Sequence, residues 1–217
     1  MLIKDYISKD FPAFETSSPV DEALYLVNDF GFSHIFIKQK GFYQGALLKE
    51  VLEENQGVLL SEISVHSERF AVSGESTLLD TIKIFNTFDT NILPVINPNE
   101  KYLGYISYED VFKEFSKYPL FSENGAVLTV ETALKTYSFT EIAKIVESNN
   151  CRFFGAFINS IEEDRIQITM RISHENLSSV DESFERFGYS VVRKFYTDEK
   201  EEMLKDRYQF MQKYLQI

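Results

Sequence analysis

The chain has 217 residues, and its 22 lysines and arginines against 34 aspartates and glutamates give a formal net charge of −12. Residues 1–120 alone carry 10 basic and 18 acidic side chains, a net charge of −8. This acidity argues against a nucleic-acid binder, which needs Lys and Arg to neutralise phosphates, and against docking on an anionic membrane. The absence of a signal-peptide core and of any long apolar run predicts a cytoplasmic protein that does not span a membrane. The single cysteine, Cys151, fits a reducing compartment.

The first half of the sequence contains a repeat at an offset of 58 residues, which aligns residues 18–27 with residues 76–85. In each copy a helix start precedes apolar residues at helical spacing. Ser18 is the predicted N-cap of the first helix, with Pro19 at its first helical position. Thr77 and Asp80 have capping-box spacing in the second helix.

Each predicted helix leads into two short strands joined by a hairpin turn, and a further helix follows. A brief lead-in strand precedes each unit, at about residues 11–16 and 69–73. The expected order in each copy is therefore β-α-β-β-α, over these ranges: strands 34–37 and 45–47 with a helix at 49–54, then strands 92–96 and 102–106 with a helix at 108–115.

The residues of the second copy resemble a CBS repeat, the family named for cystathionine β-synthase. The resemblance lies in Leu-Pro-Val-Ile at residues 93–96 and in Leu-Gly-Tyr-Ile-Ser-Tyr-Glu-Asp-Val at residues 103–111. Two such repeats form a CBS pair, or Bateman module. In this family the pairs are not catalytic, and they commonly bind adenosine-containing ligands in a cleft between the repeats. The first copy departs from the pattern, because Phe36 replaces the proline and Leu48 and Val51 replace the polar pair.

The resemblance places a nucleotide site at Ser107 and Asp110, together with Thr77, Pro94 and Tyr105. A carboxylate at Asp110 suits the two hydroxyls of a ribose, and Ser107 at a helix start suits a phosphate. A second interpretation needs no ligand, since Ser107-x-x-Asp110 also has the spacing of a capping box. Leu48 and Val51 cannot hold a ribose, so we expect at most one such site.

The charge of the first half limits the ligand. The few cations in or near the second repeat include His66, Arg69, Lys83 and Lys101. A polyphosphate such as ATP needs several nearby cations, so AMP, adenosine or a cationic adenosyl compound is easier to accommodate.

The second half predicts a strand at 126–131, a helix opened by the capping box Ser138–Glu141, and two strands at 152–159 and 165–172. A helix with Leu177, Val180, Phe184 and Phe187 on one face follows, with Gly188 after its end and a last strand at 189–195. The order β-α-β-β-α-β is the ferredoxin-like split βαβ.

The length and the closing Phe-Gly-Tyr-Ser-Val-Val at residues 187–192 resemble an ACT domain, whose members bind amino acids or serve for association. The β-α loop at 132–137, where family members hold amino acids, here lacks a glycine. A CBS pair followed by an ACT domain is similar to the acetoin-utilisation-type (AcuB-like) proteins. The fold class expected is α/β (α+β), with a CBS pair at 1–120 (repeat one at about 11–55, repeat two at about 69–117) and an ACT-like domain at 125–196. A C-terminal helix at 197–217, with an apolar seam at Leu204, Tyr208, Met211 and Leu215, packs either on its own domain or in a dimer.

These features predict a non-enzymatic regulatory protein that binds an adenine nucleotide or adenosyl metabolite and relays the signal to its ACT-like domain or to an unknown protein partner. The alternative is a dimeric interaction or assembly protein with vestigial ligand sites. Both resemblances imply a homodimer. No cofactor or metal is expected, because His34, His66 and His174 are scattered and no zinc-type spacing occurs.

Overall fold

The structure is a computed structural model that describes residues 1–195, and it divides the chain into two compact units. Unit 1 is Met1–Phe115, and unit 2 begins at Ser116. Both combine helices with sheets, so the predicted α/β class is confirmed. The predicted C-terminal helix at 197–217 lies outside the described residues. The domain limits near residues 120 and 125 stay a prediction.

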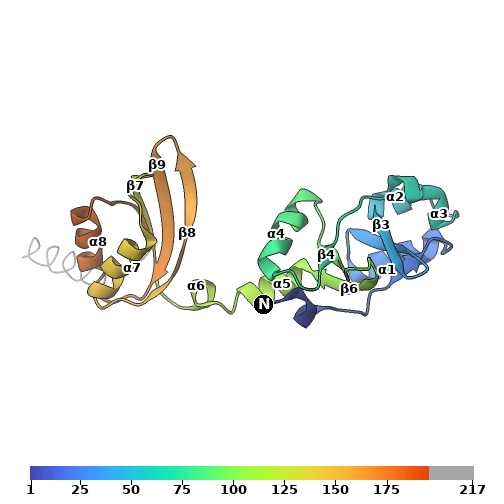
Figure 1. Cartoon of the computed structure of the whole chain (residues 1–217), viewed down its shortest axis with the longest axis horizontal. Helices are drawn as coiled ribbons and strands as arrows, with labels where there is room; N and C mark the ends of the chain where they lie inside the picture. The colour runs from blue at the N-terminus through green and yellow to red at the C-terminus, as the bar shows by residue number, and fades with distance from the viewer. Residues whose placement is uncertain (196–217) are drawn as a thin grey trace, which may run out of the picture. The chain divides into compact units, whose positions relative to one another are not determined.

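Unit 1 contains the same order of elements twice (Figure 1), as the sequence repeat predicts. In each copy the first strand is parallel to the second, and the second is antiparallel to the third. The sheets therefore have the orders β1-β2-β3 and β4-β5-β6. The first copy consists of η1 (Ile3–Tyr6), β1 (Ala13–Glu15), α1 (Val20–Phe30), β2 (His34–Gln39), β3 (Phe42–Leu48) and α2 (Lys49–Glu54). The second consists of α3 (Leu60–Ile63), η2 (Ser64–His66), β4 (Val72–Ser73), α4 (Leu78–Thr87), β5 (Ile92–Ile96), β6 (Tyr102–Ser107) and α5 (Tyr108–Phe115).

The segment that leads into each repeat packs on the other repeat. The backbone N–H of Ile3 donates to the carbonyl of Ser76 over 2.9 Å, and that of Leu60 donates to the carbonyl of Ser18 over 3.0 Å. The sequence did not predict η1, α3 or η2, because these short turns carry no clear periodicity of their own. The exchange is nearly symmetric, because Leu60 and Ser76 follow their counterparts Ile3 and Ser18 by 57 and 58 residues, close to the offset of the repeat. It ties the repeats into a single core.

The repeats also meet at a polar junction formed by equivalent positions, Ser33 and Asn91. The backbone N–H and hydroxyl of Ser33 donate to Oδ1 of Asn91 over 2.9 and 3.0 Å. The backbone N–H of Asn91 donates to Oγ of Ser33 over 3.1 Å. Because residue 33 meets residue 91 at an offset of 58, the local pseudo-twofold axis passes close to this junction.

One predicted helix cap is wrong. The helix α1 begins at Val20, with Pro19 in extended conformation at the N-cap position, and no side chain caps it. Ser18 instead donates its backbone N–H to Glu15 and accepts from Leu60 through its carbonyl. The N–H of Val20 donates to the carbonyl of Val58 over 3.0 Å. The crossing segment thus takes over part of the capping that the sequence assigned to Ser18.

Unit 2 has the predicted β-α-β-β-α-β order, in a sheet of strand order β10-β7-β9-β8 with antiparallel neighbours. The helices α7 and α8 lie on the same face of this sheet (Figure 1). Along β9 the buried residues alternate with less buried ones, as predicted for a strand with one covered face. The elements are α6 (Pro119–Ser122), β7 (Ala126–Ala133), α7 (Phe139–Ser148), β8 (Phe153–Glu162), β9 (Arg165–Ile172), α8 (Leu177–Arg186) and β10 (Ser190–Phe195).

The capping box predicted for α7 forms only in part. Oγ of Ser138 accepts the backbone N–H of Glu141 over 3.3 Å, as expected. In a complete capping box the Glu141 carboxylate would also accept the backbone N–H of Ser138. Here the hydroxyl of Tyr189 accepts that N–H instead, and it donates to Oε2 of Glu141 over 2.8 Å. Gly188, just before Tyr189, has a φ of +85° after the end of α8, as predicted. Cys151 is buried in the short segment between α7 and β8.

Candidate functional site

Ser107 and Asp110 lie together where β6 passes directly into α5. The Ser107 hydroxyl donates to Oδ2 of Asp110 over 2.7 Å, and the backbone N–H of Asp110 donates to Oγ of Ser107 over 3.0 Å. Both side chains are half-buried. The serine therefore caps α5 without help from the carboxylate. Since a carboxylate accepts up to about four hydrogen bonds, the bond from Ser107 leaves Asp110 able to accept from ribose hydroxyls.

Tyr105 joins repeat two to the N-terminal segment. Its backbone exchanges two hydrogen bonds with Ser8, of 2.8 and 2.9 Å, along the outer edge of β6. Its hydroxyl donates to Oδ1 of Asp10 over 2.7 Å, and its ring meets Phe11 and Phe32 edge-on. Burial, followed by the bond to Asp10, raises the pKa of Tyr105 far above its usual range, so the phenol stays a proton donor. The predicted site residue is thus a contact between repeats.

Gly104 is required by the same edge pairing. A Cβ at this position would lie 2.3 Å from the carbonyl oxygen of Ser8 and 2.5 Å from Cγ2 of Ile7. Its φ of +145° is also one that side-chain-bearing residues rarely adopt. The glycine of the predicted motif therefore admits the chain's own N-terminal segment beside Ser107 and Asp110.

The two remaining predicted residues have different surroundings. Pro94 is buried in β5 directly opposite Tyr105, so the structure brings these two positions together. Thr77 precedes α4, where its N–H and hydroxyl both donate to Oδ2 of Asp80 over 2.8 Å. These bonds hold the pKa of Asp80 below its usual value. The capping role predicted for Thr77 and Asp80 is confirmed, and the ligand role of Thr77 stays a prediction.

Residues 3–10 and α5 together carry five carboxylates and three lysines: Asp5, Asp10, Glu109, Asp110 and Glu114 against Lys4, Lys9 and Lys113. Tyr6 donates through its hydroxyl to Oε1 of Glu114 over 3.1 Å, and Asp10 accepts from Tyr105. Lys4 is engaged by Glu75 at 3.2 Å. The surroundings of Asp110 therefore favour a neutral or cationic ligand over a polyphosphate.

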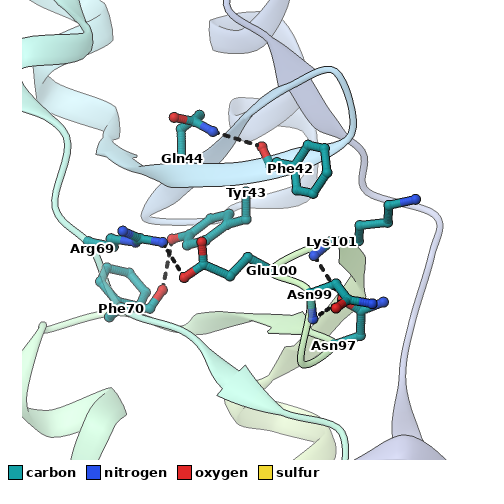
Figure 2. Close-up of polar contacts among 9 residues, drawn as sticks. All are labelled: Phe42, Tyr43, Gln44, Arg69, Phe70, Asn97, Asn99, Glu100 and Lys101. Atoms are coloured by element: carbon teal, nitrogen blue, oxygen red, sulfur yellow. Dashed lines mark hydrogen bonds and ion pairs between the residues drawn. The ribbon is translucent and has the colours of Figure 1, made fainter.

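Two of the cations expected to help a phosphate instead lie at the hairpin ends, where the repeats meet (Figure 2). Arg69 pairs with Glu100 at 2.6 Å, and Nζ of Lys101 stands 5.8 Å from the centre of the Phe42 ring. Lys101 precedes β6 and Ser107 ends it, so the two are about 20 Å apart along a strand of this length. Neither cation is placed to neutralise a phosphate beside Ser107.

The equivalent positions in repeat one are apolar. Leu48 and Val51 correspond to Ser107 and Asp110, Ala46 to Tyr105, and Pro19 to Thr77. Leu48 ends β3 and pairs with His34 in the same way that Ser107 pairs with Ile92. The backbone of the site is thus duplicated, and only repeat two carries the polar groups.

Sequence reasoning missed the part of this region that comes from the N-terminus. Ser8, Asp10 and Tyr6 contact β6 or α5, although they precede the predicted start of repeat one at about residue 11. A signal existed in the repeat itself. Residues 60–68 contact repeat one and lead into β4, just as residues 3–8 lead into β1, so the symmetry of the repeat predicts that residues 3–8 cover repeat two.

Unit 2 contains a surface hollow of about 260 Å³ at the end of its β8–β9 hairpin, lined by Glu131, Ser160, Glu162, Glu163, Arg165 and Gln167. Its central carboxylate, Glu131, already accepts from Arg165 and Gln167 over 2.9 Å each. These bonds lower the pKa of Glu131. The one arginine of the hollow is therefore already paired with Glu131. Near the end of β7, the Thr132 hydroxyl donates to the carbonyl of Gly188 over 3.3 Å.

Across residues 1–195, no group of three or more His, Cys, Asp or Glu side chains has the geometry to hold a metal ion. Within the same residues, no helix is long and apolar enough to cross a membrane.

Comparison with known proteins supports the repeat assignment directly. Residues 60–117 match the family model described as the CBS domain. No curated protein matches the sequence of the chain.

Several solved structures are similar to the chain over about half its length. A CBS domain pair/ACT domain protein from Thermotoga maritima shares 24% identity, over 53% of this chain and 96% of that one, with a TM-score of 0.48. The CBS domains of a transcriptional regulator from Streptococcus pneumoniae share 14% identity, over 52% and 98%, with a TM-score of 0.47. A CBS domain pair solved with 5′-methylthioadenosine and S-adenosyl-L-methionine shares 16% identity, over 54% and 96%, with a TM-score of 0.43.

Proposed function

We propose that this protein is a non-catalytic regulatory sensor whose unit 1 binds one adenosine-type ligand beside Ser107 and Asp110. The observation that carries the proposal is the half-buried pair itself, with a hydroxyl and a carboxylate joined over 2.7 Å at the start of α5. It lies in the part of the chain that matches the CBS domain. Repeat one has Leu48 and Val51 at these positions, so one ligand is expected per chain.

The charge around the site supports AMP, adenosine or a cationic adenosyl compound rather than ATP. Asp10, Glu114 and Asp110 are nearby carboxylates, whereas Arg69 and Lys101 are held at the far end of β6. Each added phosphate would raise the electrostatic cost of binding.

A ligand can pass a signal through unit 1 only if it binds two arrangements of the repeats with different affinities. The N-terminal segment is suited to such a role, because it belongs to the start of the chain and yet borders the site through Ser8 and Asp10. Unit 2 is proposed to be an ACT-like domain that passes the change to a partner, in a homodimer of the acetoin-utilisation type.

A second candidate function is an assembly protein with a vestigial site. One observation favours it, since Ser107 and Asp110 satisfy each other and Tyr105 is engaged by Asp10 without a ligand. In this case the polar pair serves only the helix cap and the repeat contact.

The experiment is a thermal-shift titration of the full chain with adenosine, AMP, ADP, ATP and S-adenosylmethionine. A ligand at a large excess over its Kd should raise the Tm by about 5 °C or more. Asp110→Asn should abolish the shift and change the ligand-free stability by about 1 kcal/mol or less, because the Ser107 cap remains. Glu109→Gln, one residue away on the same helix, should keep the shift.

Three results would contradict the sensor proposal. These are a shift that survives Asp110→Asn, a shift larger for ATP than for AMP, or no shift with any of the five compounds. The last result, together with a folded Asp110→Asn variant, would support the assembly function instead.

A further inference from the structure

The sheet of unit 2 has one face covered by helices and one face that they leave open. The helices α7 and α8 lie on the first face (Figure 1), where Leu128 of β7 and Ile168 of β9 are fully buried. Successive residues of a strand point to opposite faces, so Thr129 and Thr169 point to the other one. This second face is called the open face below.

The open face carries exposed aromatic side chains. Phe157 of β8 is paired with Thr169 and is 45% exposed, and Phe195 of β10 is paired with Val127 and is 64% exposed. The hydroxyls of Thr129 and Thr169 lie 3.0 Å apart and bond to each other. Apolar side chains can therefore cover the centre of this face without leaving a polar group unsatisfied.

The short helix α6 covers one corner of the open face. A Cβ at Gly155 would lie 3.2 Å from Cβ of Leu120, and Arg171 donates to the carbonyl of Glu123 over 2.9 Å. The four residues of α6 extend only about 6 Å, little more than the spacing of two strands. Most of the open face therefore needs another cover.

The charge of the open face changes along its strands. Arg193 and Arg171 belong to the two rows of paired residues at the end where β10 stops, with Phe195. The opposite end is the β8–β9 hairpin, whose hollow is lined by three glutamates and one arginine. A segment that fits this face should therefore be acidic beside the end of β10 and basic beside the hairpin.

The chain beyond β10 has this distribution of charge. Residues 198–203 contain four acidic side chains and one basic side chain, whereas residues 204–217 contain three basic and one acidic. The helix predicted at 197–217 has an apolar seam at Leu204, Tyr208, Met211 and Leu215. A helix over this range would be about 31 Å long, close to the length of about 33 Å expected for the ten residues of β8.

We propose that residues 197–217, which lie outside the described residues, dock as an amphipathic helix on the open face of their own unit. From the end of β10 the segment would turn back and run toward the β8–β9 hairpin. Successive rows of the sheet are about 7 Å apart, and helical residues rise about 1.5 Å each. Glu201 would then lie near Arg193, and Arg207 near Glu131, while the apolar seam faces the centre of the sheet.

Attachment to β10 favours this segment over a second copy or another protein. The short connection holds the segment beside the face at an effective concentration in the millimolar range. A second copy, in contrast, is repelled at long range by the net charge of −12 that each chain carries. The proposal does not depend on the ligand site of unit 1.

The first test places a photo-crosslinking amino acid at position 157 of the full chain, in an equal mixture of isotope-labelled and unlabelled protein. Crosslinks from position 157 to residues 200–215 of the same chain are expected. The matched control is the same amino acid at position 187. Phe187 is also exposed, but it follows α8 on the covered side of the sheet, so it should not crosslink to this segment.

The second test is the rate of chymotrypsin cleavage after Tyr208, which measures how often the segment leaves the face. Phe157→Asp should speed this cleavage by roughly tenfold, because it removes an apolar contact. Arg193→Glu should speed it by about two- to fivefold, and the added change Glu201→Arg should reverse the effect. Arg186→Glu, the same change of charge at the end of α8, is the control and should leave the rate unchanged.

Crosslinks that join labelled to unlabelled chains, or that miss residues 200–215, would overturn the proposal. Equal cleavage rates for the wild type and a natively folded Phe157→Asp variant would also overturn it, and Arg193→Glu decides the point if that variant does not fold. The ligand-induced rise in Tm depends on unit 1 and should persist in both variants. Its absence from the wild type would therefore count against the sensor function and not against the docking of this segment.

Discussion

His34 illustrates how a single residue can make stability depend on pH. Its side chain is 2% exposed in β2, with Nδ1 2.9 Å from Oγ of Ser33 and the Phe70 ring edge-on at 5.5 Å. Burial lowers the pKa of His34 to about 4, against weaker opposing effects of Glu50 and Asp89. The imidazole is therefore neutral in the folded state over the pH range in which it takes up a proton in the unfolded chain.

The expected result is a loss of stability as pH falls from about 6.5 to about 4. In this window His34 is protonated in the unfolded state and neutral in the folded state, so the free energy of unfolding decreases as the pH falls. The full effect is on the order of 3 kcal/mol. Urea denaturation of the wild type and of His34→Ile at several pH values measures it, since isoleucine occupies the equivalent position 92.

Carboxylates contribute equally to both proteins, so the difference between the two stability curves isolates the histidine. Curves that stay parallel from pH 7 to pH 4 would contradict the assignment. A constant offset is expected in addition, because the isoleucine loses the contact with Ser33.

At the scale of elements, the edge of β6 holds the N-terminal segment. The pairing of Ser8 with Tyr105 and the bond from Tyr105 to Asp10 both depend on close approach at Gly104. The matching contact in repeat one is looser, since a Cβ at Gly45 would lie 3.0 Å from Ser67 and Glu68. The N-terminal segment is thus part of the structure of repeat two.

Gly104→Ala should displace this segment and destabilise unit 1 by about 2–4 kcal/mol, because overpacking against Ser8 adds to backbone strain. Gly41→Ala is the matched control. Its φ of +83° is also unfavourable for alanine, but no atom lies within 4 Å of the added Cβ. It should cost about 1 kcal/mol. Faster hydrogen exchange of residues 3–10 in Gly104→Ala would report the displacement of the segment. Equal losses of stability in Gly104→Ala and Gly41→Ala would contradict the role assigned to Gly104.

At the scale of the whole molecule, each unit has its own buried core. The core of unit 1 draws on both repeats and on Ile3 of the N-terminal segment. The core of unit 2 is built on β7, β9 and the helices α7 and α8, with Phe184 fully buried. Since the described cores share no residue, the two units are expected to unfold separately.

Phe184→Ala should therefore weaken unit 2 alone, by about 3–5 kcal/mol. Native-state hydrogen exchange should accelerate in β7 and β9 and stay unchanged in β2 and β5. Phe36→Ala, in the core of unit 1, should give the opposite pattern. A single cooperative loss of protection throughout the chain, with either variant, would show that the units unfold together.

The element order was predictable because it depends on local patterns. The apolar spacing of α4, the Thr77–Asp80 cap and the alternation along β9 are set by neighbours in sequence. The failed cap at Ser18 marks the limit of such reasoning. Its carbonyl meets Leu60, more than forty residues away, and a contact at that distance leaves no local pattern.

Residue types at fixed spacing were enough to predict the duplication, the polar pair of repeat two and the β-α-β-β-α-β order of unit 2. Three features became visible only in the folded chain: each lead-in segment covers the opposite repeat, Tyr105 binds Asp10, and Leu79, Ile82, Tyr108 and Phe112 are exposed together. An apolar residue at helical spacing predicts a buried face. Whether a neighbour in the same chain covers that face depends on packing between distant segments, which spacing along the sequence does not encode.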